Sequence, residues 1–577
     1  MLRKKILMVL FVVYLALNGC AEGRSRPAPP FRTLFSNDMT NITTCCSPYS
    51  PAGTPFRLDG LHGSVDETVG VGIDVHFLQP AFGWVALWKS DTYPYDKQHS
   101  DWLMQEFGIE PSCYGRYMLQ GGDIVGDFVE RCREKGMKTF ISLRMNDHHR
   151  MENVPVLKEL MSTYGASDSS FQFRRNWGNP DFFVRYRDMV DNRMDLSVSR
   201  VKEENPEYRL GYQTAIPERG DMELWDYVRR HREELRVHSL WNWAMPGARQ
   251  HKLDFVTEIC EQYDIDGFEL DFMRRPPYFS DDTPMDERQE IMTAFIRKVR
   301  DVLDRTAKEG QYRWLSVRVP FRLPALRAIG VDVKDWHDAG VDIFNLSCHW
   351  PTEQQHDLAR IHLDVPEAPL YIELTHAAFN YRPVGENNVT VMATPNMLYT
   401  TAHLAYSRGA QGIYSFNFAY YRHYGRKLTE PPFEIFKVLR DPDLVAQQPQ
   451  HYFLTARDYN GKRFRQRPGQ NFSETFVIDM APPKGGWMTD GKLRILMTPT
   501  FPNVPCDVYF NGIRLKKNTD ISSPYSTELD EDFGCADSVR AWTLPKSILQ
   551  DGVNNVRVDL PHGIEGALMF CIDIAIK

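Results

Sequence analysis

Two carboxylates stand two residues apart in the segment 264–274, which reads DIDGFELDFMR. Alternate side chains of a β-strand point to the same side, so Gly267, Glu269 and Asp271 share one face and the apolar side chains share the other. Burying two like charges side by side is costly, because they repel each other and lose their water. A chain that keeps such a pair usually needs it for proton transfer or nucleophilic attack. We therefore predict that Asp271 and Glu269 are catalytic.

A third carboxylate, Glu373, lies in another strand-like segment, 370–374. Carboxylates that flank a glycosidic bond can hydrolyse it, because one protonates the leaving oxygen while the other attacks the sugar carbon or activates water. A separation of about 5 Å leads to retention of configuration, and a wider one to inversion. We predict Glu373 as the catalytic partner opposite Asp271. The structural alternative is a buried ion pair of Glu373 with Arg318 or Arg144.

Arginines and aromatic residues near predicted strand ends suggest a binding shell. An arginine such as Arg144 can hold a carboxylate or sulfate with paired N–H groups. With Arg274, Arg275 and Arg318 expected nearby, an anionic polysaccharide is a candidate substrate, although these arginines could equally pair with the site's own carboxylates. Tryptophans can stack on sugar rings or fill the core. The residues that we expect to bind substrate are Arg144, Asn146, Asp147, Arg274, Trp84, Trp88, His376 and Asn417.

The sequence gives little support for a metal site or for a nucleophilic serine or cysteine. Asp147, His148, His149 and His376 are possible metal ligands, but two adjacent histidines cannot easily share one ion and the sequence has no HExxH motif. A nucleophilic serine or cysteine has no GxSxG support. We expect neither a metal nor a cofactor.

Strand-like and helix-like segments alternate along the first three quarters of the chain. This alternation implies parallel strands, and eight such units predict a (β/α)₈ barrel. Polar residues follow the strands, at the end where this fold places its active site. An open doubly wound sheet is the alternative, but it would need a glycine-rich phosphate loop after the first strand. The eight predicted strands are 31–35, 73–78, 139–145, 264–274, 314–319, 342–346, 370–374 and 412–418.

The chain beyond about residue 450 reads as all-β, with short strands and a hairpin signal at Asn511-Gly512. We predict a β-sandwich that binds carbohydrate or buttresses the barrel. A long excursion, about 150–235, is expected to be a lid or cleft wall. The predicted sandwich strands are 492–497, 506–510, 539–543, 553–560 and 568–576. The predicted parts are a targeting segment (1–20), a Pro-rich linker (21–30), the barrel (31–445) and the sandwich (446–577).

The first twenty residues resemble an export signal, with basic residues at 3–5 and an apolar run over 6–17. Leu17-Asn18-Gly19-Cys20 resembles a bacterial lipobox, which makes Cys20 the expected lipidation site. Asn18 is not the small residue usually found there, so a plain secretory cut is the alternative. We expect an exported protein that is lipid-anchored in the bacterial cell envelope, or otherwise periplasmic or secreted.

Composition and net charge limit the kinds of molecule that this protein is expected to bind. The net charge of -8 argues against nucleic acid or an anionic membrane surface as the main partner, so membrane contact is expected only through the lipid anchor. Ten cysteines, of which Cys20 is one, show no CxxC pair. One or two disulfides are possible in an exported protein, while Cys132 and Cys260 are expected to be buried thiols.

The motif Asp266-Gly267-Phe268-Glu269-Leu270-Asp271 resembles the fourth-strand motif of several barrel glycoside hydrolases. The nearest resemblance is to the glycoside-hydrolase-like family 10 barrels of exported bacterial proteins. It covers roughly 31–440 and includes Asn37-Asp38, Met145-Asn146-Asp147 and Glu373-Leu374-Thr375-His376. The chain is also similar to alpha-glucosidase and alpha-galactosidase barrels, which implies that Asp271 is a nucleophile. It departs from the cellulase-like clan, which has Asn-Glu after strand four, and from chitinases, because Met273 stands where they have an acidic Glu.

These observations predict a glycoside hydrolase that cleaves a poly- or oligosaccharide at the C-terminal face of the barrel. Two other classes stay open. One is a non-catalytic surface lipoprotein that binds glycans in the same cleft. The other is a polysaccharide lyase, which would use a His, Tyr or Lys base beside the arginines.

Overall fold

A computed structural model of the chain describes most of the residues beyond the N-terminal segment. Residues Phe31–Lys577 form one compact unit. The predictions for Cys20, Trp84, Asp147, His148 and His149 lie outside the described residues. The described residues are 26–45, 47, 51, 54–80, 85–146, 154–164, 172–174, 183–185, 198–381, 389–424, 429–455, 457–458, 461–462, 472–497, 505–523, 525, 539–560 and 569–577.

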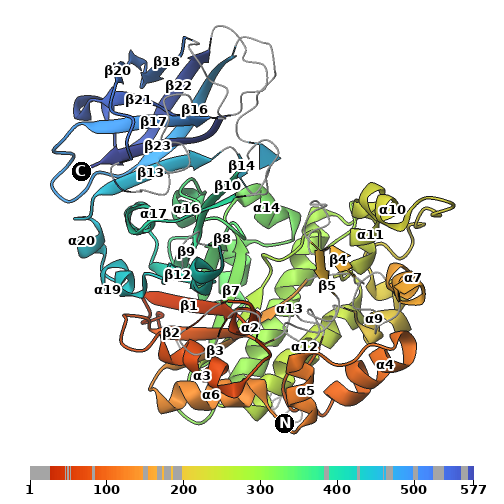
Figure 1. Cartoon of the computed structure of the whole chain (residues 1–577). Helices are drawn as coiled ribbons and strands as arrows, with labels where there is room; N and C mark the ends of the chain where they lie inside the picture. Colours follow the sequence, from red (N-terminus) through yellow and green to blue (C-terminus); the bar gives the residue numbers. More distant parts are fainter. Residues whose placement is uncertain are drawn as a thin grey trace, which may run out of the picture. The chain divides into compact units, whose positions relative to one another are not determined.

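Eight parallel strands close into a barrel in the order β1-β12-β9-β8-β7-β6-β3-β2 (Figure 1). Each of the eight predicted strands is confirmed, and β1 closes the ring by pairing with both β2 and β12. The strands are β1 (Thr33–Asp38), β2 (Val75–Gln79), β3 (Lys138–Arg144), β6 (Gly267–Asp271), β7 (Trp314–Pro320), β8 (Ile343–Ser347), β9 (Leu370–Thr375) and β12 (Gly412–Phe416).

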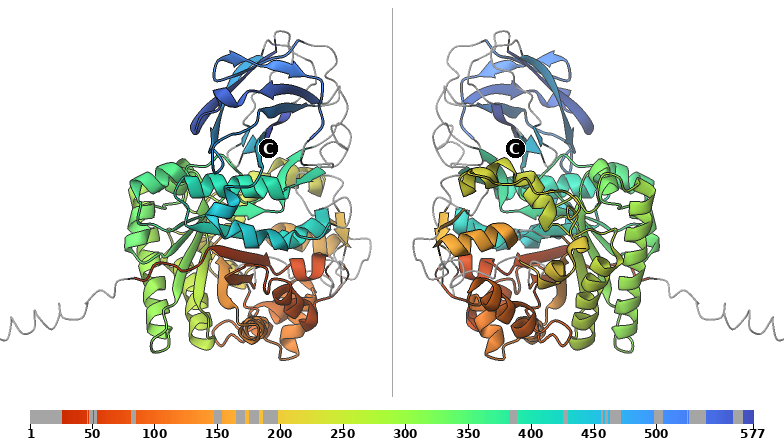
Figure 2. Two further views of the ribbon diagram at one scale, coloured as in Figure 1. Left: turned by 90° about the vertical axis from the view of Figure 1, so that its left-hand side faces the viewer. Right: turned by 90° about the vertical axis from the view of Figure 1, so that its right-hand side faces the viewer.

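Helices cover the outer side of the barrel strands (Figures 1 and 2). Helix α6 (Ile124–Glu134) shows why: its buried side chains recur at helical spacing on one face. It begins at Asp123, whose side chain accepts a hydrogen bond from Gly126 N, and it ends before Gly136, whose φ of 68° favours glycine. The other covering helices are α3 (Leu58–Asp66), α12 (Pro246–Gln262), α13 (Met285–Thr306), α14 (Leu323–Ala328), α15 (Val333–Asp338), α16 (Leu358–Asp364) and α17 (Pro395–Ser407).

The predicted excursion carries four α-helices among its described residues: α7 (Val154–Tyr164), α9 (Arg200–Glu204), α10 (Leu224–Arg230) and α11 (Arg232–Ser239). Helices α7, α10 and α11 share a small apolar core with α4 (Asp101–Phe107), to which Leu157, Val228 and Leu235 contribute. This part of the excursion is therefore packed structure. No helix in the described part of the chain is long and apolar enough to cross a membrane.

The barrel interior is apolar at one end and polar at the other. Phe77, Phe140, Trp314 and Tyr371 belong to a buried cluster at the N-terminal end of the strands. A Cβ atom on Gly267 would lie 2.5 Å from the Phe140 ring and 2.6 Å from the Trp314 carbonyl oxygen. Glycine is required there because aromatic neighbours already fill the space. The next two inward-facing residues of β6 are the carboxylates Glu269 and Asp271.

Two antiparallel sheets follow the barrel and pack around one apolar core. The predicted β-sandwich is confirmed, and the Asn511-Gly512 turn joins β18 and β19 with positive φ at both residues. Strand β13 (Gln450–Thr455) was not predicted, because it is buried on both faces and packs against α17, so its sequence does not alternate. One sheet has the order β13-β23-β17-β21-β20, with β23 (Met569–Ile576), β17 (Gly491–Met497), β21 (Val539–Leu544) and β20 (Lys516–Asn518). The other has the order β16-β22-β18-β19, with β16 (Phe472–Met480), β22 (Gly552–Leu560), β18 (Asp507–Phe510) and β19 (Ile513–Arg514). The domain boundary at 445/446 stays a prediction.

Candidate active site

Glu269 lies in a buried polar layer inside the barrel. Its strand register aligns it with Ser142 of β3 and Ser316 of β7. Four side chains donate hydrogen bonds to its carboxylate: Ser142 Oγ at 2.7 Å, Tyr414 Oη at 2.9 Å, Ser316 Oγ at 3.2 Å and Asn345 Nδ2 at 2.5 Å. Burial, and then the charge of Asp271, raise the pKa of Glu269 to about 7.

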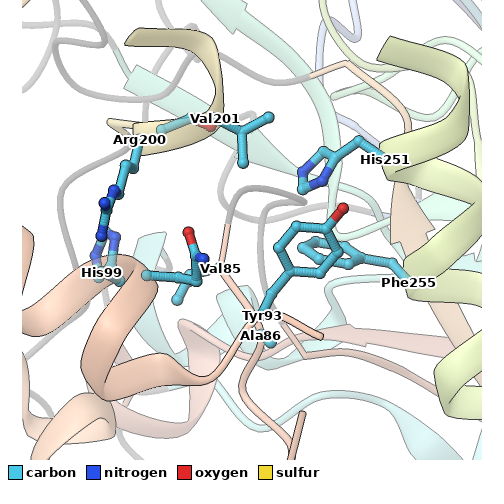
Figure 3. Close-up of a pocket in the computed structure, with 10 residues that line it drawn as sticks. Val85, Ala86, Tyr93, His99, Arg200, Val201, His251 and Phe255 are labelled. Atoms are coloured by element: carbon cyan, nitrogen blue, oxygen red, sulfur yellow. The ribbon is translucent and has the colours of Figure 1, made fainter. Parts of the chain in front are cut away.

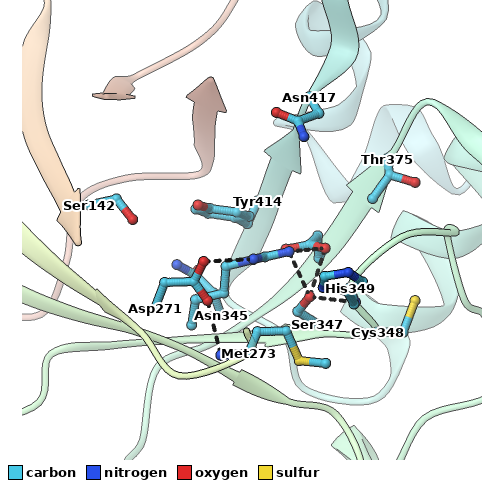
Figure 4. A network of polar contacts seen from close by, with 12 residues as sticks. Ser142, Asp271, Met273, Asn345, Ser347, Cys348, His349, Thr375, Tyr414 and Asn417 are labelled. Atoms are coloured by element: carbon cyan, nitrogen blue, oxygen red, sulfur yellow. Dashed lines mark hydrogen bonds and ion pairs between the residues drawn. The ribbon is translucent and has the colours of Figure 1, made fainter. Parts of the chain in front are cut away.

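Asp271 and Glu373 meet at one guanidinium, that of Arg318, in the layer above. Figure 4 labels Asp271, Ser347 and Tyr414 of this network. Arg318 Nη1 donates to Asp271 Oδ2 at 3.0 Å, while Nε and Nη2 donate to the two oxygens of Glu373 at 2.5 and 2.9 Å. Burial alone would lower the pKa of Arg318, but the two carboxylates raise it well above its usual range. The structural alternative for Glu373 is thus observed, and the same arginine also holds Asp271.

Each of these carboxylates has further donors. Asp271 Oδ2 accepts a hydrogen bond from Gln79 Nε2 at 3.1 Å, and its Oδ1 accepts one from Met273 N at 3.0 Å. Ser347 Oγ donates to Glu373 Oε1 at 2.7 Å. Both carboxylates are buried, with Asp271 0% and Glu373 3% exposed. This donor set stabilises negative charge on both groups.

Arg144 of β3 lies at the same end of the barrel, where it pairs with Asp38 of β1. Its Nη2 lies 2.7 Å from Asp38 Oδ2. Burial opposes the charge on Asp38, but Arg144, Arg274 and the hydrogen bonds from Thr40 lower the pKa of this carboxyl below its usual value. Asn417 accepts a hydrogen bond from Asp38 N at 3.1 Å, so it fixes the end of β1 beside the end of β12.

Arg274 lies directly beyond β6, closer to the rim. Its Nε is 3.6 Å from Asp271 Oδ2, and its Nη1 is 3.2 Å from Nδ1 of His349. The guanidinium groups of Arg274 and Arg318 lie over the ring of Phe416, at 5.2 and 4.2 Å from its centroid. Such cation–π contacts stabilise buried arginines.

Unusual backbone gathers at the same end of the barrel. Four non-glycine residues of the described part have positive φ, and three of them follow barrel strands: Arg275 (51°) after β6, His349 (82°) after β8 and Asn417 (58°) after β12. Such conformations cost of order 1–3 kcal/mol each and cluster at functional sites. The residues with strained backbone therefore lie at the same end of the barrel as the buried charged side chains.

Two predicted binding residues support the mouth from beside it. Asn146 donates to the carbonyl oxygens of Arg275 and Pro277 at 3.2 and 3.0 Å, so it shapes the loop that carries Arg274. His376 is buried with its ring edge-on to Trp350, at a centroid distance of 4.7 Å, and burial lowers its pKa to about 3.

The prediction for Trp88 is wrong. Its indole N–H donates to Glu258 Oε2 of α12 at 2.8 Å, and its ring packs edge-on against Phe255 of the same helix. Because α12 covers the outside of the barrel, Trp88 belongs to the packing there. The aromatic side chain that does lie at the mouth is Phe416.

Within the described residues, the structure bears on the predictions for cysteines and for metal ligands. No group of three or more His, Cys, Asp or Glu residues there could hold a metal ion. Cys132 and Cys260 are buried thiols, as predicted. The described cysteines, all of them buried, are Cys45, Cys113, Cys132, Cys260, Cys348, Cys506 and Cys571.

A small pocket lies apart from this network, where α9 and α12 meet the loop that follows β2 (Figure 3). Tyr93, His251 and Phe255 form much of its wall, and Tyr93 packs edge-on against both other rings. None of the predicted site residues lines it.

Three residues that organise the mouth were not predicted as site residues: Gln79, Ser347 and His349. Asp38, which also organises it, was named only within the family resemblance, as part of Asn37-Asp38. Each lies at or just after the C-terminal end of a predicted strand, which is the signal that could have identified them. Glu269 and Asp271 were correctly placed on one face, but they lie in different layers.

Comparisons with known proteins give a fold likeness only. No family model and no curated protein matches the sequence. Alpha-L-fucosidase isoenzyme 2 from Paenibacillus thiaminolyticus is 14% identical, with 71% of this chain and 48% of that chain covered and a TM-score of 0.37. A noncanonic maltogenic alpha-amylase from Thermotoga neapolitana is 11% identical, with 93% and 98% covered and a TM-score of 0.32. A GH36 alpha-galactosidase from Geobacillus stearothermophilus is 11% identical, with 93% and 57% covered and a TM-score of 0.34. This chain thus spans about half the length of the fucosidase and galactosidase chains, and likeness at this level carries no argument about activity.

Proposed function

We propose that this protein is a glycoside hydrolase whose reaction takes place at the C-terminal mouth of the barrel. The observation that carries the proposal is the pair of buried carboxylates, Asp271 and Glu373, that one arginine holds together. They come from β6 and β9, with two strands between them on one side of the ring and four on the other. Carboxylates so placed can act from two sides on one bond.

In this proposal Asp271 is the carboxylate that attacks the sugar carbon or activates water. Its donors, Gln79, Arg318 and Met273 N, hold it in one orientation and stabilise the negative charge that either role requires. Glu373 is the second carboxylate of the pair, on the other side of the mouth. Arg318 then screens the two carboxylates from each other, since its single positive charge lies between them.

Glu269 has a different role in this proposal. Because all four of its hydrogen-bond partners are buried barrel side chains, it positions the strands beneath the reacting groups. We therefore assign it as a positioning residue.

Substrate must enter from the rim. His349 and Arg275 are partly exposed there, whereas Asp271 below them is not. His349, which helps to separate Asp271 from the rim, is therefore expected to shift when a sugar binds. A bound sugar would also replace water around the charges, which strengthens their interactions.

The finer predictions belong to the same proposal. We propose that the chain is of the glycoside-hydrolase-like family 10 type, that it is exported, and that Cys20 carries the lipid anchor. What supports these points is the sequence pattern described above.

The experiment that tests the activity is release of reducing ends from a panel of neutral and anionic polysaccharides by the purified mature chain. A hydrolase releases reducing ends without a change in ultraviolet absorbance. A lyase would form an unsaturated, ultraviolet-absorbing product, and a glycan-binding protein would bind a member of the panel without cleaving it. Either of the last two results contradicts the proposal.

A further inference from the structure

Among the described residues of the mouth, Arg274 has a guanidinium nitrogen, Nε, that lacks a hydrogen-bond partner. Arg318 makes two hydrogen bonds to Glu373 and one to Asp271, and Arg144 makes one to Asp38. Arg274 has no carboxylate oxygen within hydrogen-bond distance among the described residues, since its closest one, Asp271 Oδ2, is 3.6 Å away.

The unbonded atom is also buried. Arg274 is 5% exposed, and its Nε–H has no hydrogen-bond partner. A buried hydrogen-bond donor without a partner costs free energy, because it has given up its hydrogen bonds to water and gained none in return. A ligand oxygen placed beside Nε, next to Asp271, would supply the missing acceptor.

The charges around Arg274 favour a negative ligand atom. Burial, and then repulsion from Arg144 and Arg318, lower the pKa of Arg274 to about 9, and these effects outweigh the attraction of Asp271 and Asp38. An added anion within hydrogen-bond distance of Arg274 would offset that repulsion, because the nearest carboxylate oxygen, Asp271 Oδ2, is 3.6 Å away.

Local backbone and ring contacts fix the direction of this side chain. Arg275 has a positive φ, and its carbonyl oxygen is held by Asn146. The Phe416 ring lies against the guanidinium, and His349 Nδ1 is within 3.2 Å of Nη1. Arg274 is therefore placed before any substrate arrives, which lowers the entropy cost of binding.

We propose that Arg274 binds an oxyanion of the sugar substrate, a carboxylate or a sulfate ester, so that the enzyme acts on an acidic glycan. This inference rests on the proposed function, and it adds the substrate class. The Nε–H and Nη–H groups of one guanidinium match two oxygens of either anion. The anion would lie beside Asp271, so the acidic sugar would occupy the position at or next to the bond that is cleaved.

The test compares Arg274→Gln, Arg274→Lys and the native chain on matched pairs of substrates. One pair is polygalacturonate and its methyl ester, and the other is a sulfated galactan and its desulfated form. Initial rates give kcat/KM, and calorimetric titration gives the binding of oligosaccharides from the same four polymers. Arg133→Gln is the control, because Arg133 lies at the opposite end of the barrel with its side chain 62% exposed.

We expect the native chain to prefer one acidic polymer over its neutral counterpart. Arg274→Gln should lower kcat/KM on that polymer about 10- to 100-fold more than on its neutral counterpart, which is the size of a charge-assisted hydrogen bond. Arg274→Lys should recover part of the loss, because it keeps the charge without the fork. The preferred pair tells whether the anion is a carboxylate or a sulfate.

Three results would overturn the inference. The native chain could cleave a neutral polymer better than its acidic counterpart, or Arg274→Gln could lower both members of a pair equally; both leave the hydrolase proposal intact. Acidic oligosaccharides could also bind equally well to the native chain and to a folded Arg274→Gln variant. Cleavage of none of the polymers, together with binding that depends on Arg274, would instead contradict the hydrolase proposal and support the anion site.

Discussion

At the scale of single residues, the mouth of the barrel balances three arginines against three carboxylates, all buried. Removing charges from water costs several kcal/mol per ion, and apolar residues of similar volume often stabilise a fold as well or better. A network of this size is therefore poorly explained by stability alone. Its place at the C-terminal ends of β6, β7 and β9 favours chemistry as the reason for its presence.

Glu269 gives a prediction about pH. Its pKa of about 7 in the folded chain lies above the ordinary value of 4.5. Between these values the folded state binds more protons than the unfolded state, so the free energy of unfolding falls as pH rises through this range. Glu269→Gln removes that dependence, and the hydroxyls of Ser142 and Tyr414 can turn to accept hydrogen bonds from the new amide.

Denaturant unfolding of both chains at pH 5 and pH 8 checks this prediction. The stability of the native chain relative to Glu269→Gln should fall between the two by about 2–3 kcal/mol, since one pKa unit corresponds to about 1.4 kcal/mol. An equal difference at both pH values would show that Glu269 does not titrate in this range.

At this scale, the sequence does not show how far along the barrel axis each side chain lies. Alternation correctly put Glu269 and Asp271 on one face. Residues i and i+2 of a strand, however, are about 6.6 Å apart along it, so one carboxylate lies deep in the barrel while the other lies near the mouth. The position of a residue along the barrel axis depends on the stagger of neighbouring strands, which no single strand encodes.

At the scale of elements, the eight barrel strands and α6 were predictable because their patterns are local. Strand β13 was not, because it is buried on both sides by contacts with distant segments. Trp88 was misplaced for a similar reason: its loop packs on Glu258 of α12, some 170 residues away. Local periodicity reports that a side chain is buried, and tertiary contacts decide where.

Gly267 gives a prediction at the element scale. Gly267→Ala should destabilise the fold by about 1–3 kcal/mol, because the new methyl group would meet the Phe140 ring and the Trp314 backbone. Denaturant unfolding measures the change. Gly491→Ala in β17 is the matched strand control. It should cost less, since its new methyl group would come no closer than 3.0 Å to a neighbouring atom, on the Ile576 side chain. Equal costs for the two variants would contradict the packing account.

At the scale of the whole molecule, polar contacts join the barrel to the β-sandwich. Gln354 accepts a hydrogen bond from Phe453 N at 2.9 Å. Arg408, at the end of α17, donates two hydrogen bonds to Asp479 of β16 at 2.9 and 2.7 Å, and further ones to Met480 O and Asp551. We expect the two sheets to stiffen the barrel through these contacts.

Calorimetry of the mature chain should therefore show one cooperative unfolding transition. Arg408→Ala should destabilise that transition by about 1–3 kcal/mol, because it leaves a partly buried Asp479 without its partner. Arg514→Ala, which removes an exposed pair with Asp507, should leave the transition nearly unchanged. Two separate transitions, with Arg408→Ala altering neither, would mean that the parts fold independently.

The most direct test of the central claim is the turnover of Asp271→Asn on a polysaccharide that the native chain cleaves, with binding of its oligosaccharides measured alongside. We predict that kcat falls at least about 1,000-fold while binding changes little, because the amide keeps the shape of the side chain but cannot attack or activate water. Asp264→Asn, which alters an outer aspartate paired with Lys308, should keep native turnover. Native-like turnover by a folded Asp271→Asn chain would contradict the account.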